Sequence, residues 1–296
     1  MNKDTNGYSV RVRRVVDYLS EHLDDRLDLE ALARVAHFSP YHFHRIYRGL
    51  LGETVHETVR RLRLQRAAID LLERELSVER TAARAGYSSQ AAFTRAFRAE
   101  YGEPPARYRG TRRIARLDRE SNPTMYAVEI VRFGPLRIAA VEHRGDYQLT
   151  GRAFERLMTV AATTGLLTAE TQSIGTYHDD PVSVPETELR AMACITAPDD
   201  WKPSGELIEA HIEGGRYAQI VHTGPYLELE TAYDWLYRTW LPLSAEEPRN
   251  LPCVELYLND PRQVPAKDLE TAVMMPLESR ERGTRDSQSA ALDGAS

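Results

Sequence analysis

The stretch "LDLEALARVAHFSPYHFHRIYRGLLG" (residues 27–52) decides the fold of the first half of the chain, because it recurs fifty residues later as "SVERTAARAGYSSQAAFTRAFRAEYG" (77–102). Aromatic residues and glycines coincide at this offset: Phe43 with Phe93, Tyr47 with Phe97, and Gly52 with Gly102. Each copy contains one short apolar stripe, a turn of about four residues and a second stripe at helical spacing. The sequence therefore predicts two helix-turn-helix units in an all-α domain.

Residues typical of helix ends support this assignment. Asp28, Ser39 and Ser77 stand where each helix begins, and a fourth N-cap is expected at Ser88 or Ser89. Pro40 occupies a first-turn position, where its missing N–H costs nothing. Further helices are expected over residues 9–22 and 53–74, the second of which connects the two units.

The polar residues of the second helix in each unit are candidates for DNA contact. With Phe43, Ile46 and Tyr47 held in the core, other side chains project outward near the helix start, namely Tyr41, His44, Arg45 and Arg48. Gln90, Ala91, Thr94 and Arg95 take these places in the repeat. The N-terminal part of such a helix enters the major groove, where arginine pairs with guanine and glutamine with adenine.

Several arginines are better suited to phosphates, which position a protein without reading sequence. They are Arg48, Arg98, Arg107, Arg109, Arg112 and Arg113. The alternative interpretation is a compact helical domain with solvated arginines.

Residues 9–110, including the closing "GEPPARYR", resemble the DNA-binding domain of the AraC family. In that family, one chain carries two helix-turn-helix units on a rigid linker helix, and they enter successive major-groove segments. The resemblance implies that the base-contacting positions are Tyr41, His44 and Arg45 in the first unit and Gln90, Ala91, Thr94 and Arg95 in the second. Ala91 departs from the polar residue often found at its position.

Composition divides the 296 residues into two halves of opposite charge. Residues 1–119 carry a net charge of +7 and residues 120–296 a net charge of −13. Such asymmetry indicates a half that meets polyanions joined to one that does not. The sequence has no apolar run long enough for a membrane span, and the N-terminus does not look like a secretory signal. Two cysteines form neither a disulfide framework nor a metal motif. We therefore expect a cytoplasmic protein with no cofactor, no metal and no membrane partner.

The second half begins after a linker expected at residues 111–124, and a disordered tail is expected at 279–296. Residues 125–278 contain β-branched runs and turn signals. "VEHRGDYQLTGRAFERL" aligns with "IVHTGPYLELETAYDWL" at an offset of 79, and "SIGTYHDDP" with "CVELYLNDP" at 80. This duplication predicts an α+β domain of two strand-helix-strand-strand units in a pseudo-twofold pair, with a pocket at the seam.

One residue breaks the second repeat. Glu255 interrupts the apolar strand residues Cys253, Val254, Leu256 and Leu258, and its counterpart is Gly175. A carboxylate buried there needs a partner, and the glycine is expected to leave space beside it. Aromatic residues abound nearby, and a carboxylate among aromatic rings suits a lipophilic cation. The alternative is that Glu255 lies on the solvent face of an alternating strand and that the aromatic residues are core.

Residues 126–278 are similar to the GyrI-like small-molecule-binding domain, which occurs behind AraC-type domains in Rob-like regulators and in other multidrug sensors. Its marker, "P-x-x-E-x-Y-x-x-D-P", is intact from Pro252 to Pro261. The resemblance implies that Glu255 lies at the base of an aromatic pocket for hydrophobic cations. We expect Tyr147, Tyr226, Trp235 and Tyr257 to form its wall.

These observations favour a DNA-binding transcriptional regulator, expected to be an activator, whose second domain senses a small hydrophobic, cationic ligand. Double-stranded DNA and the ligand are the expected partners, with RNA polymerase as a further one, and the oligomeric state stays open. One alternative is a hydrolase of a reactive electrophile with Glu255 as general base. Another is that the second domain contacts a protein.

Overall fold

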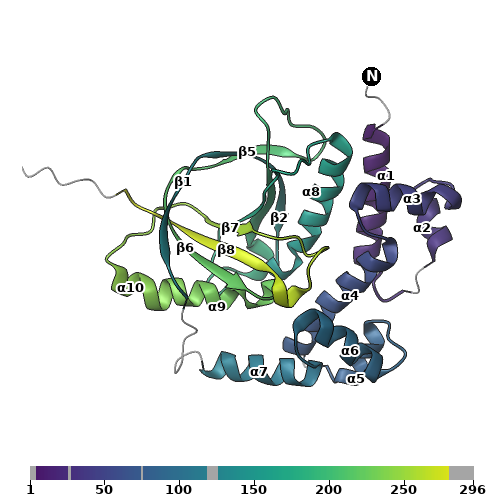
Figure 1. Ribbon diagram of the computed structural model, residues 1–296, viewed down its shortest axis with the longest axis horizontal. Coiled ribbons are helices and arrows are strands. Elements are labelled where there is room, and N and C mark those ends of the chain that lie inside the picture. The colour runs from purple at the N-terminus through teal and green to yellow at the C-terminus, as the bar shows by residue number, and fades with distance from the viewer. Residues whose placement is uncertain (1–4, 26–27, 75, 119–125, 280–296) are drawn as a thin grey trace, which may run out of the picture.

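The N-terminal half consists of helices arranged as two helix-turn-helix units (Figure 1). The computed structural model describes residues 5–25, 28–74, 76–118 and 126–279. Helices α2 and α3 form the first unit, α5 and α6 the second, and α4 connects them. Their bounds are α1 Thr5–Glu21, α2 Leu29–Val35, α3 Pro40–Leu51, α4 Val55–Leu72, α5 Val78–Arg84, α6 Gln90–Tyr101 and α7 Pro105–Asp118. The predicted pair of units is confirmed.

Most of these helices begin at the predicted capping residues. Three of the predicted capping side chains accept a hydrogen bond from a first-turn backbone amide, namely Asp28, Ser77 and Ser89. Ser39 holds the N-cap position of α3, but its side chain makes no capping hydrogen bond. The amide of His42 bonds the carbonyl of Ser39 instead. Gly52 and Gly102 end α3 and α6 in the left-handed region, at φ 75° and 81°, which favours glycine.

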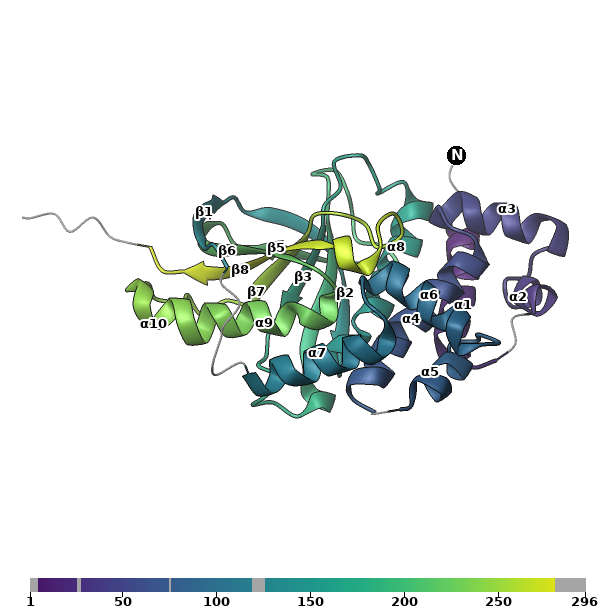
Figure 2. The same cartoon turned by 60° about the horizontal axis from the view of Figure 1, so that its bottom comes forward.

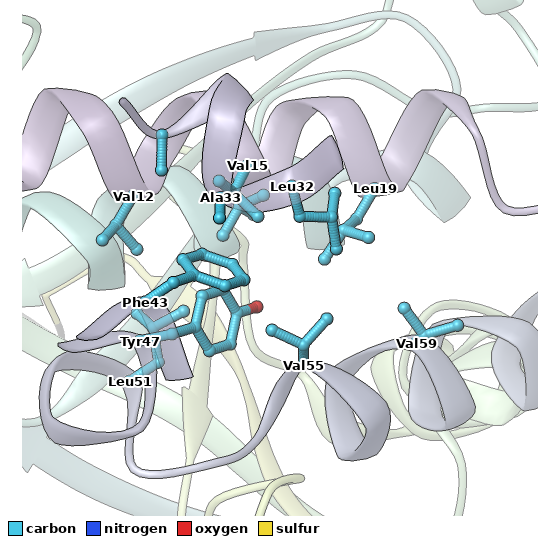
Figure 3. Close-up of a cluster of buried hydrophobic side chains, with 12 residues drawn as sticks. Val12, Val15, Leu19, Leu32, Ala33, Phe43, Tyr47, Leu51, Val55 and Val59 are labelled. Carbon is cyan, nitrogen blue, oxygen red and sulfur yellow. The ribbon is translucent and has the colours of Figure 1, made fainter. Parts of the chain in front are cut away.

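Each unit has its own core, and α4 contributes to both. In the first core, Phe43 and Tyr47 of α3 pack against α1, α2 and the start of α4 (Figure 3). In the second, Phe93 and Phe97 of α6 pack against the end of α4 and against Tyr108 of α7. Because α4 is shared, the two units are held at a fixed spacing along it.

The C-terminal half is built on one antiparallel sheet of eight strands with the order β1-β6-β8-β7-β3-β4-β2-β5. The strands are β1 Glu129–Phe133, β2 Leu136–Arg144, β3 Ser173–Tyr177, β4 Arg190–Thr196, β5 Ile208–Ile212, β6 Gly215–Thr223, β7 Cys253–Tyr257 and β8 Glu270–Leu277. Two main helical segments join them: α8 Gly151–Thr164, and α9 Leu229–Asp234, which continues through a π-helical turn, Trp235–Trp240, into α10 Leu241–Ser244. The short 3₁₀ turns are Tyr147–Leu149, Glu186–Glu188, Tyr226–Glu228 (η3) and Ala266–Asp268 (η5).

The predicted duplication is confirmed, and each unit carries one further strand at its start. These added strands cross between the units, since β1 pairs with β6 and β5 pairs with β2. The strand order reads the same when the two units are exchanged, so a pseudo-twofold axis passes between β3 and β7.

The two faces of the sheet differ. One face carries its own apolar core, which includes Ile138, Ile174 and Val254. On the other face, α8 packs on β2 and β4, and α9 packs on β6. The central strands β3 and β7 therefore form the floor of a cleft between the two helices.

The helical half packs against the sheet domain in both views (Figures 1 and 2). Helix α1 lies along α8, α3 also contacts α8, and α6 contacts η5. Ion pairs cross this interface: Arg13 with Glu206 at 2.6 Å, Arg61 with Glu155 at 2.8 Å, and Arg112 with Glu228 at 2.5 Å.

Helix α7 extends to Asp118, so the first part of the predicted linker is helical. The rest of that linker, residues 119–124, lies outside the described residues, as does the predicted tail from residue 280. Among the helices that the structure describes, none is both long and apolar enough to cross a lipid bilayer.

Candidate functional site

A cavity of about 1300 Å³ lies over β3 and β7, between α8 and α9. Helices α4 and α6 of the N-terminal half close one side of it. The α4 residues in its wall are spaced along one helical face and are Arg61, Gln65, Ile69 and Leu72, with Glu73 following at the end of the helix. The cavity is therefore bounded by both halves of the chain, and its size suits an organic molecule.

Glu255 lies at the floor of this cavity and is 3% exposed. Alternation along β7 sends Val254 and Leu256 into the apolar core on the opposite face. Cys253, Glu255 and Tyr257 line the cavity. The alternative of a solvent-facing Glu255 is wrong because helices cover the face on which it lies.

Tyrosine hydroxyls hold both oxygens of the carboxylate. Tyr233 donates to Oε1 and Tyr257 to Oε2, each at 2.9 Å. The hydroxyls of Tyr177 and Tyr257 lie 2.9 Å apart. Burial raises the pKa of Glu255 to about 7, and the hydroxyls of Tyr257, Tyr233 and Tyr177 act in the opposite direction. Hydrogen bonds to the charged form favour it, whereas desolvation disfavours it more strongly here.

Gly175 stands directly opposite Glu255 in the pairing of β3 with β7. The expectation that this glycine leaves open space is wrong. A Cβ at residue 175 would lie 2.7 Å from the hydroxyl of Tyr257 and 2.8 Å from Cε2 of Tyr177. The two tyrosines fill the space, so glycine is required for them to reach the carboxylate.

Three of the four predicted wall residues, Tyr147, Tyr226 and Tyr257, line the cavity. The rings of Tyr226 and Tyr257 meet edge to face, 5.2 Å between centroids, as do those of Phe154 and Tyr257, at 5.1 Å. Tyr147 meets Tyr177 in the same manner at 5.0 Å. The rings thus form a connected aromatic wall.

The prediction for Trp235 does not fit the cavity, because this residue is not part of the lining. Its place is taken by Tyr233 and Tyr237, which are four residues apart and share one helical face. Trp235 lies two residues from each of them and points to another face. Sequence reasoning missed Tyr177, Tyr233 and Tyr237 as site residues. The helical spacing of the last two was the available signal.

The predicted DNA-contacting residues mostly lie on exposed surfaces of α3 and α6. His44, Arg45 and Arg48 of α3 are exposed, as are Gln90, Ala91 and Arg95 of α6, while Thr94 is half-buried. The side chain of Tyr41 lies outside the described residues. The aromatic residues between them face the cores, as the spacing predicts.

Three of the predicted phosphate-contacting arginines have partners within the protein. Arg107 pairs with Glu103 at 3.4 Å but stays exposed, whereas Arg112 and Arg109 are held in the packed structure. Arg112 pairs with Glu103 and Glu228 and lies over the ring of Tyr108, 4.1 Å from its centroid. Arg109 donates to the carbonyl of Leu76. Both therefore serve packing in this structure. Arg113 has no described side chain.

No group of three or more His, Cys, Asp or Glu side chains in the described part of the chain is arranged to hold a metal ion.

Comparison with known proteins gives two family matches. Residues 126–278, about half of the chain, match the GyrI-like small molecule binding domain, and residues 32–111 match a helix-turn-helix domain. SoxS, a regulatory protein of Salmonella typhimurium, is 31% identical over 98 residues, covering 33% of this chain and 92% of SoxS. YbfP, an HTH-type transcriptional regulator of Bacillus subtilis, is 34% identical over 102 residues, covering 34% of this chain. The chain spans only 35% of the length of YbfP.

Among solved structures, the C-terminal domain of EcmrR is 18% identical, with a TM-score of 0.44, covering 52% of this chain and 99% of that domain. The matched sequence families account for both the double helix-turn-helix unit and the duplicated sheet. The chain belongs to the GyrI-like small-molecule-binding family and carries an AraC-type helix-turn-helix domain before it, which is the arrangement of a DNA-binding regulator with its own ligand-binding domain.

Proposed function

We propose that the cavity binds a lipophilic organic cation and that this binding controls transcription at DNA sites recognised by α3 and α6. The observation that carries the proposal is the state of Glu255, a buried carboxylate without a counter-charge. Among the described residues, no arginine, lysine or histidine nitrogen lies within 4.0 Å of it. A buried charge of this kind is costly without a partner, and a bound cation supplies one.

The wall of the cavity supports a cation that is also apolar. Aromatic faces attract cations, and the attraction strengthens when water is excluded. Further carboxylates at the cavity, including Asp180, Glu230 and Asp234, add negative potential that favours entry of positive charge. A ligand with aryl or alkyl groups around one positive centre matches both features.

We propose that residues in the N-terminal parts of α3 and α6 contact the DNA bases. These residues are Tyr41, His44, Arg45, Gln90, Ala91, Thr94 and Arg95, with Arg48 on a phosphate. Two units on one helix suit two neighbouring segments of the major groove. SoxS, a relative that this chain covers almost completely, supports a regulatory role.

Activation rather than repression is part of the proposal, with RNA polymerase as the partner that responds. A further relative, AdaA of Bacillus subtilis, is named a bifunctional transcriptional activator and DNA repair enzyme, and is 30% identical over 95 residues, 45% of its length. Transcription from a selected promoter in vitro, with and without the cation, tests this part. Repression would reverse it.

Titration with tetraphenylphosphonium tests the ligand proposal. Wild type is compared with Glu255→Gln by calorimetry, and with Glu142→Gln as control, an exposed carboxylate on β2 of the same sheet. We expect Glu255→Gln to weaken binding at least about tenfold, and Glu142→Gln to leave it within about twofold. Triphenylphosphine oxide, a neutral molecule of similar shape, should bind far more weakly than the cation. Equal affinity for the two molecules would show that the positive charge of the ligand does not contribute to binding.

Catalysis is the competing function, and the same samples address it. A regulator releases its ligand unchanged, so the cation is recovered intact after incubation. For the hydrolase alternative, hydrolysis of an added electrophile by wild type, lost in Glu255→Gln, would be the supporting result.

A further inference from the structure

The cavity is linked to the first recognition helix by a chain of polar contacts that begins at Arg61. This residue lies on α4 and lines the cavity. Its Nη2 bonds Oε1 of Glu155 on α8 at 2.8 Å and Oε1 of Glu53 at 2.7 Å. All three side chains are largely buried, with exposures of 16%, 16% and 8%. Arg61 therefore joins the cavity wall of one domain to the start of α4 in the other.

The chain of contacts continues from Glu53 into the core beneath α3. Thr58 donates its hydroxyl to Oε1 of Glu53 at 2.9 Å, and the hydroxyl of Tyr47 lies 3.0 Å from that of Thr58. Tyr47 is fully buried in α3, with its hydroxyl directed toward Val55 of α4 (Figure 3). The polar path thus ends at an aromatic residue that fixes α3 on its core.

A second connection reaches the end of α3. Arg262 lines the cavity and donates to the carbonyl of Leu51, the last residue of α3, at 3.2 Å. The same arginine is held by Asp260 through bonds of 2.6 and 2.9 Å. Asp260 belongs to the motif that contains Glu255, so one segment supplies both the cavity carboxylate and the contact with α3.

The charges around Arg61 and Arg262 make the contacts of these two arginines sensitive to an added cation. Within the described part of the chain, Glu53, Glu155 and Asp260 form ion pairs with two guanidinium groups, those of Arg61 and Arg262. Glu155 lines the same cavity as Glu255, so a cation bound at Glu255 adds positive charge that opposes the bond of Arg61 to Glu155, while Arg61 keeps its bond to Glu53. The structure shows Arg61 bridging both glutamates, and loss of the bond to Glu155 would leave it bonded to Glu53 alone, which is the kind of two-state element that a relay requires.

We propose that occupancy of the cavity is relayed to α3 through Arg61, with Arg262 as the second anchor. The proposal rests on the proposed function, because it takes a cation as the occupant. In the free protein, Arg61 ties the first helix-turn-helix unit to α8. Binding releases this tie and lets α3 adjust on DNA, so the cation raises DNA affinity. Equivalently, DNA raises affinity for the cation by the same factor.

The test is a thermodynamic cycle on the full chain. Affinity for tetraphenylphosphonium is measured for free protein and for protein saturated with a duplex enriched from a random library by wild type. We expect the two affinities to differ at least about fivefold in wild type, within the usual range of allosteric coupling. In Arg61→Gln and in Glu155→Gln, the ratio should fall below about twofold. The ratio is the readout because it is insensitive to a general change in cation affinity.

Controls separate this relay from loss of folding and from failure of the ligand proposal. Arg63→Gln changes an arginine of the same helix that bonds the carbonyls of Leu23 and Asp25 away from the cavity, and should keep the wild-type ratio. Glu155→Gln keeps the pair of Arg61 with Glu53, so it reports on the relay even if Arg61→Gln folds poorly. If Arg61→Gln and Glu155→Gln both bind the cation tightly and keep the wild-type ratio of the two cation affinities, the relay alone is overturned. Absence of cation binding to wild type overturns the relay together with the proposed function.

Discussion

Cation binding should depend strongly on pH, because the proposed counter-charge is a carboxyl group whose pKa is raised to near neutral pH by burial. The pKa of Glu255 is raised to about 7, so its negative charge forms between pH 6 and pH 8. A cation needs the ionised form, and binding in turn favours ionisation. Raising the pH should therefore strengthen binding until the group is fully ionised.

The size of the expected change in cation affinity follows from the fraction of Glu255 that is ionised at each pH. With a pKa of about 7, this fraction rises from roughly 3% at pH 5.5 to roughly 97% at pH 8.5. Apparent affinity scales with the competent fraction, so it should increase about 30-fold across this range. That factor corresponds to about 2 kcal/mol, since each tenfold change is about 1.4 kcal/mol.

Tetraphenylphosphonium suits the assay because its own charge does not change with pH. Calorimetric titrations at half-unit steps give the midpoint and amplitude for wild type and for Glu255→Gln. His178 also lines the cavity, and burial holds its pKa below the ordinary value of a histidine. Protonation of His178 adds positive charge, so it also weakens cation binding as the pH falls. This contribution of His178 remains in Glu255→Gln, so the variant separates it from that of Glu255. Affinity independent of pH in wild type, or an equal pH dependence in both proteins, would refute the assignment to Glu255.

Three further predictions concern the proposed DNA-contacting helices α3 and α6 and the tyrosines that surround Glu255. Arg45→Ala and Arg95→Ala should each weaken binding to the selected duplex by about 1–3 kcal/mol and leave binding to random duplexes nearly unchanged, as measured by fluorescence anisotropy. Equal losses on both duplexes would make them phosphate contacts. Gly175→Ala places a methyl group 2.7 Å from the hydroxyl of Tyr257, so cation affinity should fall at least about tenfold. Unchanged affinity would show that Tyr177 and Tyr257 can move aside without loss of cation binding. Tyr233→Phe removes a hydrogen bond to the charged carboxylate, which should shift the midpoint of cation binding to higher pH, and an unmoved midpoint would contradict the role of this hydroxyl.

The fold could be predicted from the sequence largely because both domains are duplicated. An offset of fifty residues aligns the apolar positions of two helix-turn-helix units, and an offset of about eighty aligns two sheet units. What the repeats do not contain is the pairing of β1 and β5. Each is a short strand whose partner lies in the other unit, so its position depends on contacts remote in sequence.

The site was only partly predictable, for similar reasons. Glu255 is visible because a carboxylate interrupts apolar strand residues. Which rings surround it depends on helix phase, which places Tyr233 and Tyr237 in the wall and leaves out Trp235. The contribution of α4 to the cavity was not predicted, because the apolar residues of this helix serve the two helix-turn-helix cores and lie on two other faces. Arg61 and Ile69 fall on a third face, and a helix with three occupied faces is a signal that it contacts another domain.

The pseudo-twofold axis explains why this symmetric domain has one carboxylate rather than two. Gly175 and Glu255 are equivalent in the two repeats and are also paired with each other, so they lie on the axis itself. Tyr177 and Tyr257 are likewise equivalent, and their hydroxyls meet over this point. A second glutamate at residue 175 would collide with these rings and place two buried negative charges side by side, which is costly without further counter-charge. The axis therefore leaves room for one carboxylate and one cation, and we expect one bound tetraphenylphosphonium per chain.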